Sequence, residues 1–382
     1  MKNPIFNFKI VLASALFIAS IVSAQAKDAI ERTKTITKEF EVSKDTKIFT
    51  SNHLGNITIR TWDIGKAKIE AFVKVKAKKE ESIDEFLDHL NIQIKDNKSK
   101  NLIINTKLPL ISNICMPCLN EDSERRLRFR DGTVIKVTDY EVNYILTVPV
   151  SNPLNMKSSF HDIIFENDIH GQTSIELTSG DLIGKNFTNN LNLRLNFSDA
   201  KLDQVENINL KMTSSKLELN QAKNIDIDSR FSDFMIKRAN KITSNTTSCD
   251  MNINIVKSIS GESRYGTVVV DHLIERFYLK GLNTSITINQ IKNEFQEIHL
   301  HNSSFSSLKL HFENKPQYQL KFQVQFGSIQ YPKDEFNMTH SNNNEISGNI
   351  EHVCATTKHA PKDIISAVKV DGVNNKLKIY HH

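Results

Sequence analysis

The sequence is poor in glycine, proline, cysteine and tryptophan: its 382 residues include 12 Gly, 8 Pro, 4 Cys and 1 Trp. With so few glycines, the Gly-rich nine-residue calcium repeat is absent. Four cysteines are too few for a disulfide scaffold in a chain of this length. The composition carries no signature of general disorder. With 382 residues, the chain is also long enough to bury a sizeable core.

Long apolar runs are also lacking, except near the N-terminus. Lys2 and Lys9 come before the uncharged apolar run Ile10–Val22. After the run, Ala24 and Ala26 are small residues two positions apart. This pattern predicts a signal peptide over residues 1–26, cleaved after Ala26. An uncleaved anchor is the alternative, although the run is short for a spanning helix. We therefore expect an exported protein, whether periplasmic, outer-surface or secreted, with no transmembrane segment after cleavage.

A strong charge of either sign is missing as well. The formal charge is +5, and removal of residues 1–26 takes away Lys2 and Lys9 and no acid, which leaves +3. A balance so close to neutral does not indicate a nucleic-acid partner, and export argues against one.

What the sequence does contain is a repeat. Three apolar positions recur every seventeen residues over five consecutive units, without a gap. The columns are Leu191, Ile208, Ile225, Ile242 and Ile259; Leu202, Leu219, Ile236, Ile253 and Val270; and Val205, Ala222, Ala239, Val256 and Leu273.

Within one unit the apolar residues alternate with polar ones. Ile208–Met212 and Lys216–Asn220 each read as a half-buried strand, Thr213–Ser215 as a polar corner between them, and Gln221–Asn224 as a second turn. Strands this short need stacked neighbours to complete a core. The sequence therefore predicts an all-β fold, a β-solenoid of two-strand repeats over residues 151–331.

The first residue of the corner alternates between an aromatic and a serine. The series is Phe160, Ser179, Phe197, Ser214, Phe231, Ser248 and Tyr265. A coil of seventeen residues would place an aromatic on every second rung, whereas a coil of thirty-four would stack the aromatics along one edge. The simple repeat favours seventeen, and thirty-four stays open.

The region before the array, residues 27–150, is predicted to be a small β-rich segment. Ser82–Glu85 has the form of a capping box, which predicts a helix over about 83–91. Residues 107–124 are expected to form a loop. Asp131 and Gly132 predict a tight hairpin turn between two short strands.

Residues 332–382 are predicted to be a polar tail, of which Asp334–Lys362 is Asn-rich and expected to be mobile. Val368–Val370 and Leu377–Ile379 are predicted to close the chain as a terminal hairpin.

Four features of the sequence resemble one known family. They are the stretch Ser51–Asp63, the charged strand Lys66–Lys78, the helix after it and the repeated Phe/Tyr-Ser/Gly-Asp corners. The family is that of the "putative-adhesin" β-strand-repeat proteins, an exported bacterial domain of unknown function. This resemblance covers most of residues 33–331. It implies a β-solenoid, an exported location and no established catalytic residues.

Cys115-Met116-Pro117-Cys118 is the most distinctive local motif. No second pair exists to complete a zinc site, and no strand–helix context follows that would make it a redox site. We expect a local disulfide between Cys115 and Cys118, or two free thiols, and no bound metal. Cys249 aligns with small corner residues, which indicates a structural role.

Three further groups could bind a ligand. A column of aspartates could hold a cation or cap the corners; His299, His301 and His311 could hold a metal; and an arginine-rich strand could contact an anionic surface or be a solvated edge strand. The aspartates are Asp162, Asp181, Asp199, Asp233 and Asp250, with Lys216 in the gap, and the arginines are Arg125, Arg126, Arg128 and Arg130. For each we favour the structural role, so no cofactor or metal is predicted.

The sequence contains no nucleophile elbow, P-loop or dinucleotide fingerprint. We therefore predict a non-catalytic, exported β-repeat scaffold of the cell envelope that binds, like an adhesin, an unknown glycan or envelope protein. A structural or assembly role in the envelope, or an enzyme that acts on polysaccharide, are the alternatives.

Overall fold

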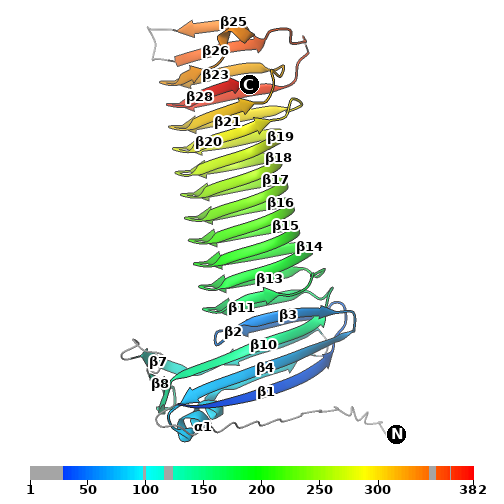
Figure 1. Cartoon of the computed structure of the whole chain (residues 1–382), viewed down its shortest axis with the longest axis vertical. Helices are drawn as coiled ribbons and strands as arrows, with labels where there is room; N and C mark the ends of the chain where they lie inside the picture. The colour runs from blue at the N-terminus through cyan, green and yellow to red at the C-terminus, as the bar shows by residue number, and fades with distance from the viewer. Residues whose placement is uncertain (1–28, 98–99, 116–123, 344–349, 362) are drawn as a thin grey trace, which may run out of the picture. The chain divides into compact units, whose positions relative to one another are not determined.

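The computed structural model describes residues 29–97, 100–115, 124–343, 350–361 and 363–382. Over these residues the chain is mostly β-strand with one α-helix, which confirms the all-β prediction (Figure 1). The chain folds as two units that divide after Glu166. Residues 1–26, the predicted signal peptide, and Cys118 lie outside the described residues.

The first unit is built on a mixed sheet. The long strand β4 lies between β1 and β10 and is antiparallel to both, and β3 runs parallel to β10 on its other side. Strand β2 runs parallel to β6 and to β11, and β12 runs parallel to β3. The strands are β1 (Ile30–Glu41), β2 (Lys47–Asn52), β3 (Ile57–Trp62), β4 (Lys66–Ala77), β5 (Asn91–Asp96), β6 (Asn101–Lys107), β10 (Asp139–Pro149), β11 (Leu154–Ser159) and β12 (Ile163–Phe165).

Helix α1 (Glu80–His89) begins three residues before the predicted start and follows β4 almost directly. Its N-cap is Lys79, which makes no side-chain capping bond, so the predicted capping box does not form. Glu80 and Glu81 instead place negative charge in the first turn, where the helix dipole favours it. Ile83 and Phe86 are the residues of α1 that are buried.

A separate sheet of three antiparallel strands follows, made of β7 (Leu110–Cys115), β8 (Arg125–Phe129) and β9 (Val134–Val137). The predicted hairpin is therefore confirmed, with Gly132 at a φ of 95° in its turn. Part of the predicted loop is strand β7, because residues 110–115 pair with β8.

The second unit is a stack of parallel coils. Figure 1 shows its long strands lying one above the other. The strands of this stack, long and short, are β13 (Thr173–Thr178), β14 (Asp181–Asn196), β15 (Asp199–Thr213), β16 (Lys216–Arg230), β17 (Asp233–Thr247), β18 (Asp250–Arg264), β19 (Thr267–Leu282), β20 (Ser285–Ile291), β21 (Glu297–Ser304), β22 (Ser307–Phe312), β23 (Gln319–Gln325) and β24 (Ser328–Gln330).

The pairing register decides the size of a coil. Leu202 pairs with Leu219, and Leu219 with Ile236, so each residue lies beside the one seventeen positions later. From β15 to β18 a coil therefore holds seventeen residues, and the thirty-four-residue alternative is wrong. The predicted second turn is a bend inside one continuous strand, because Gln204 pairs with Gln221 and Val205 with Ala222 across it.

The predicted apolar columns form the core of this unit. In the column that contains Ile225, side chains are at most 2% exposed, and the Leu219 column is at most 1% exposed. Each side chain is covered by its counterparts on the coils before and after it, as expected for a repeat that cannot bury its own apolar face.

The C-terminal region departs most from the expectation. The predicted hairpin strands are β27 (Ala367–Val373) and β28 (Lys376–His381), and they do not pair with each other as a hairpin. Strand β27 lies between β21 and β23, parallel to both, and β28 lies between β22 and β24. The last segment of the chain is thus a complete coil inserted between two earlier ones.

Part of the predicted tail closes the end of the stack. Strand β26 (Ile350–Thr357) runs antiparallel to β23, and β25 (Phe336–Asn343) runs antiparallel to β26. A short 3-10 helix, Lys333–Glu335, precedes β25. Strands that cover a sheet end in this way limit its pairing with other chains.

Candidate functional site: the corner edge of the second unit

Each coil of the second unit turns sharply at one residue, which we call the corner residue. Its backbone is left-handed, with φ between 49° and 56° in every case, and glycine occupies none of these positions. In spatial order the corner residues are Ser179, Phe197, Ser214, Phe231, Ser248, Tyr265, Asn283, Phe305, Asn374 and Phe326. Together they form what we call the corner edge.

Backbone hydrogen bonds fix this order. The N–H of Phe197 donates to the carbonyl of Thr213 on the next coil at 3.0 Å, and the N–H of Ser214 donates to that of Arg230 at 3.1 Å. The same bond recurs at each corner up to Asn374, whose N–H donates to Gln325 at 2.7 Å. Every corner from Ser179 to Asn374 is thereby tied to the coil that follows it in space.

Behind most corners lies a buried polar residue or cysteine. Ser198 and Ser215 are examples: the N–H of Ser198 donates to the Ser215 hydroxyl at 3.1 Å, and each hydroxyl donates to the carbonyl two residues before it. Cys249 fills the same slot at 2% exposure, and its Sγ lies 3.4 Å from the Thr247 carbonyl. The structural role expected for Cys249 matches this position.

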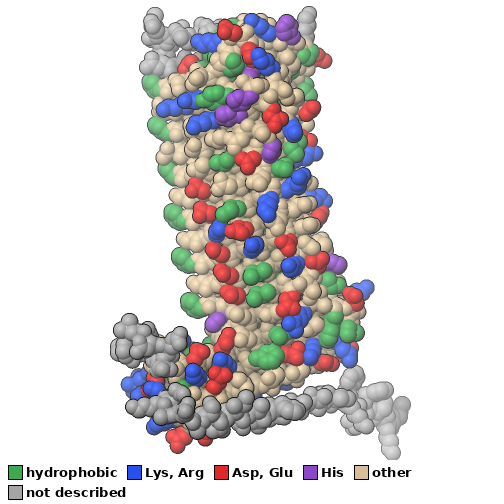
Figure 2. Space-filling model, viewed as in Figure 1, with side chains coloured by type: hydrophobic (Ala, Val, Ile, Leu, Met, Phe, Trp, Pro, Cys, Tyr) green, Lys and Arg blue, Asp and Glu red, His purple; other side chains and the backbone are tan. Residues whose placement is uncertain are grey.

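The aromatic corner residues project into solvent. Five of them alternate with serine or asparagine, so that an aromatic stands on every second coil. They are Phe197 (66% exposed), Phe231 (61%), Tyr265 (55%), Phe305 (62%) and Phe326 (52%). Figure 2 shows apolar side chains at intervals along this edge. We call these five residues the aromatic ladder.

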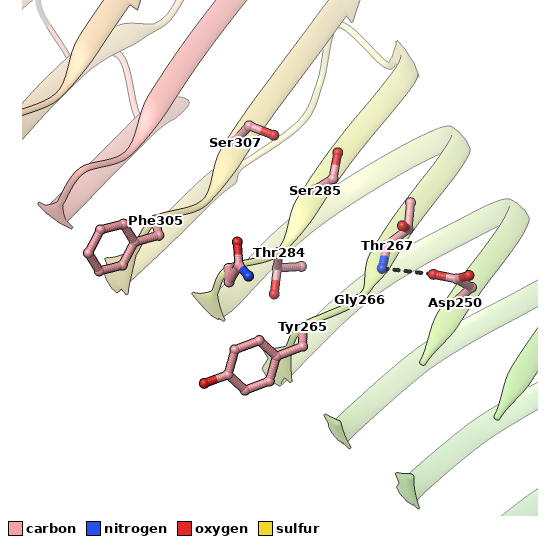
Figure 3. A pocket seen from close by; sticks show the side chains of 9 residues that line it. Asp250, Tyr265, Gly266, Thr267, Thr284, Ser285, Phe305 and Ser307 are labelled. Atoms are coloured by element: carbon pink, nitrogen blue, oxygen red, sulfur yellow. Dashed lines mark hydrogen bonds between the residues drawn. The ribbon is translucent and has the colours of Figure 1, made fainter. Parts of the chain in front are cut away.

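A shallow hollow of about 330 Å³ lies between two rings of the ladder, Tyr265 and Phe305. In Figure 3 both rings point outward from their corners, while polar side chains lie between and behind them. Asn283 is the corner residue between the two rings, and the Oδ1 atom of Asp250 accepts a hydrogen bond from the N–H of Thr267 at 3.1 Å. The other polar lining residues are Thr284, Ser285 and Ser307.

The predicted aspartate column runs directly beside the corner edge. Asp199 and Asp233 flank Lys216 on the neighbouring coils. Lys216 donates to Glu218 at 2.7 Å, and this bond, with the nearby carboxylates, raises the pKa of Lys216. Within the described part of the chain, no group of three or more His, Cys, Asp or Glu side chains is arranged to hold a metal ion.

The predicted histidines lie near the inserted coil. His299 Nε2 is 2.6 Å from the Asp371 carboxylate, and His301 stacks on Tyr278 with ring centroids 4.2 Å apart. Burial, followed by the charge of His299, lowers the pKa of His301. His311 lies on a different strand, against Tyr380. His299 and His301 lie together, with ring centroids 5.7 Å apart, whereas His311 is separate from both. The structure also supplies His299 with a carboxylate that the sequence analysis missed.

The remaining predicted groups lie in the first unit or at the chain end. Strand β8, which carries Arg125, Arg126 and Arg128, is the middle strand of its sheet and not the expected edge strand, because β7 covers its second side. Cys115 ends β7, and Cys118 lies outside the described residues, so a disulfide between them or two free thiols stays a prediction. Cys354 lies on β26, with Sγ 3.4 Å from His352 Nε2.

Four corner residues lie beyond Tyr265, where the alternation in the sequence analysis stops: Asn283, Phe305, Asn374 and Phe326. A signal for them exists. Asn283-Thr284-Ser285 and Asn374-Asn375-Lys376 each place a residue that tolerates left-handed backbone before a small polar one, as the earlier corners do.

Among the described residues no helix is both long enough and apolar enough to cross a membrane. No protein-family model and no curated protein matches the sequence.

Solved structures with a similar course of the chain include three from Parabacteroides. A putative adhesin of P. merdae is 12% identical and covers 72% of this chain and 95% of its own, with a TM-score of 0.41. A putative adhesin of P. distasonis is 10% identical, with 91% and 97% covered and a TM-score of 0.35. A putative lipid binding protein of P. distasonis is 12% identical, with 72% and 96% covered and a TM-score of 0.32. The adhesin name to which the sequence points thus recurs among these structures.

Proposed function

We propose that the protein is a non-catalytic, exported scaffold that binds a glycan along the corner edge of its second unit. The observation that carries this proposal is the aromatic ladder: five aromatic side chains, each more than half exposed, on alternate coils of one edge.

The fold itself does not need aromatics at these positions. Ser214, Ser248 and Asn283 adopt the same left-handed backbone on the coils between them. That backbone costs an ordinary residue about 1–2 kcal/mol, and a bulky residue there is a true outlier. Strain of this kind is common at functional sites. A large, exposed, strained side chain that a smaller one could replace supports a binding role.

A glycan suits the ladder better than an apolar partner does. Aromatic faces stack on the C–H face of a sugar ring, while nearby hydroxyl and amide groups can bond to the sugar hydroxyls. The ladder supplies the rings, and Asn283, Ser285 and Ser307 supply polar groups between two of them. Because polar corners separate the rings, the edge is not the continuous apolar patch typical of a stable protein interface.

The proposal is tested by applying the purified protein to a glycan array, with a pull-down from envelope extract alongside. We expect binding to one or more polysaccharides whose chain length stays unchanged on incubation. Shortening of the polysaccharide would replace the proposal with an enzyme, and capture of protein partners without any glycan would replace it with an assembly role.

Export is a second, separate part of the proposal. It is supported by the basic start, the apolar run Ile10–Val22 and the small residues before Lys27. We expect N-terminal sequencing of the protein from a native host to begin at Lys27. A protein found in the membrane with Met1 intact would contradict cleavage.

A further inference from the structure

The alternation of the corner residues follows their order in space and not their order in the chain. In the chain, Phe305 is followed by Phe326 and then by Asn374. In the stack, the N–H of Phe305 donates to Val373 of the inserted coil, and the N–H of Asn374 donates to Gln325 of the next one. Asn374 thus stands between the two aromatics.

This order separates two explanations of the alternation. Tandem duplication of a two-coil unit would produce an alternation along the chain, which Phe305 and Phe326 break. A requirement on the finished surface produces an alternation in space, which the inserted coil restores. The ladder is therefore regular from Phe197 to Phe326 because every second position on the assembled edge is aromatic.

The spacing of the ladder follows from the sheet. Neighbouring strands lie about 4.8 Å apart, so rings on every second coil are roughly 10 Å apart. Aromatic pairs make contact at centroid distances of about 4.5–7 Å, so the rings of the ladder do not stack on one another. Their faces are left available to a ligand that runs along the edge.

One class of glycan has a matching repeat. In an extended β-1,4-linked chain of pyranose sugars, each sugar is turned over relative to the one before it. The same face therefore returns on every second sugar, and the length of one disaccharide is close to the distance between two coils. Chains of glucose with α-1,4 links coil instead, and they do not present one face along a straight line.

The hollow between Tyr265 and Phe305 fits the sugar that would lie between two stacked ones. That sugar turns its other face to the edge, and its equatorial hydroxyl groups, which project sideways from the ring, come within reach of Asn283 and the polar side chains around it. Aromatic and polar corners thus alternate in the same period as the two orientations of the sugars.

We infer that the corner edge binds an extended β-1,4-linked polysaccharide in register, with one aromatic ring for each disaccharide. This inference rests on the proposed glycan-binding function and specifies its ligand class.

The test is the dependence of affinity on chain length, measured by calorimetry with β-1,4-linked oligosaccharides of glucose and of N-acetylglucosamine from the disaccharide to the decasaccharide. We expect the dissociation constant to fall in steps, by roughly tenfold for each further ring engaged, once for every two sugars added. The α-1,4-linked oligosaccharides of glucose should bind more weakly at every length.

A paired variant tests the spacing alone. Phe231→Ser combined with Ser248→Phe keeps five aromatics and every left-handed corner but sets two rings on neighbouring coils. We expect it to bind long β-1,4-linked chains roughly tenfold more weakly than the wild type. A smooth gain with each added sugar, equal binding of the α-1,4 series or an unchanged affinity of this variant would overturn the register and leave glycan binding standing. If no glycan binds at all, the proposed function fails as well.

Discussion

Leu219→Asp should strongly destabilise the second unit, with a loss of about 3–5 kcal/mol in its free energy of unfolding. Leu219 is 1% exposed and lies between Leu202 and Ile236 of the adjacent coils. An aspartate there would be a charge without a partner, buried among apolar side chains. The same reasoning applies to Ile225→Asp, since Ile225 is 2% exposed.

The matched control lies on the same coil. Lys216→Ala removes an outward-facing side chain whose hydrogen bond to Glu218 lies at the surface, and it should leave the free energy of unfolding within experimental error. Urea denaturation followed by circular dichroism measures both variants. Equal effects of Leu219→Asp and Lys216→Ala would mean that the inward and outward faces of the strands are assigned the wrong way round.

The sequence was sufficient to predict the parts of the fold that repeat. Residues seventeen apart occupy equivalent environments in a stack, so the column of Leu219 and the column of Ile225 carry the period directly. The positions of the corners could be recognised too, because a polar or small pair follows each corner residue. Their left-handed backbone could not. The period also favoured the coil of seventeen residues that the register confirms.

The parts that could not be predicted depend on pairing between distant segments. The two terminal strands have the same short alternation of apolar and polar residues whether they form a hairpin or a coil, and only their neighbours β21 and β23 decide between the two. In the same way, nothing in the sequence of β8 shows that β7 will cover its second side. The start of α1 was missed because Ser82 and Glu85 mimic a capping box inside the helix.

The candidate site was visible in the sequence only in part. The alternation from Phe160 to Tyr265 could be recognised, but its meaning depended on the coil size, which the sequence left open. Its continuation through Asn374 could not be recognised, because the alternation exists only after the last segment has been inserted between two earlier coils.

Replacement of the whole aromatic ladder by asparagine should abolish glycan binding while the fold persists. The variant changes the five residues Phe197, Phe231, Tyr265, Phe305 and Phe326. Each ring engaged is expected to strengthen binding by roughly tenfold, so a ligand that covers three rings should bind about a thousandfold more weakly without them. Asparagine already occupies two corners and tolerates left-handed backbone, so the melting temperature should stay the same or rise.

A second variant controls for the loss of exposed aromatic surface as such. Tyr278 is 41% exposed on strand β19, away from the corner residues. Tyr278→Thr should leave glycan affinity unchanged, since this ring is not part of the ladder.

The most direct measurement is a calorimetric titration of the wild type, the five-asparagine ladder variant and Tyr278→Thr with one β-1,4-linked octasaccharide of N-acetylglucosamine, and in parallel with the octasaccharide of glucose. The account predicts that the wild type and Tyr278→Thr bind at least one of the two with equal affinity. The ladder variant, with a melting temperature that is unchanged or raised, should bind at least about a thousandfold more weakly or not at all. Equal affinity of the ladder variant and the wild type would contradict it.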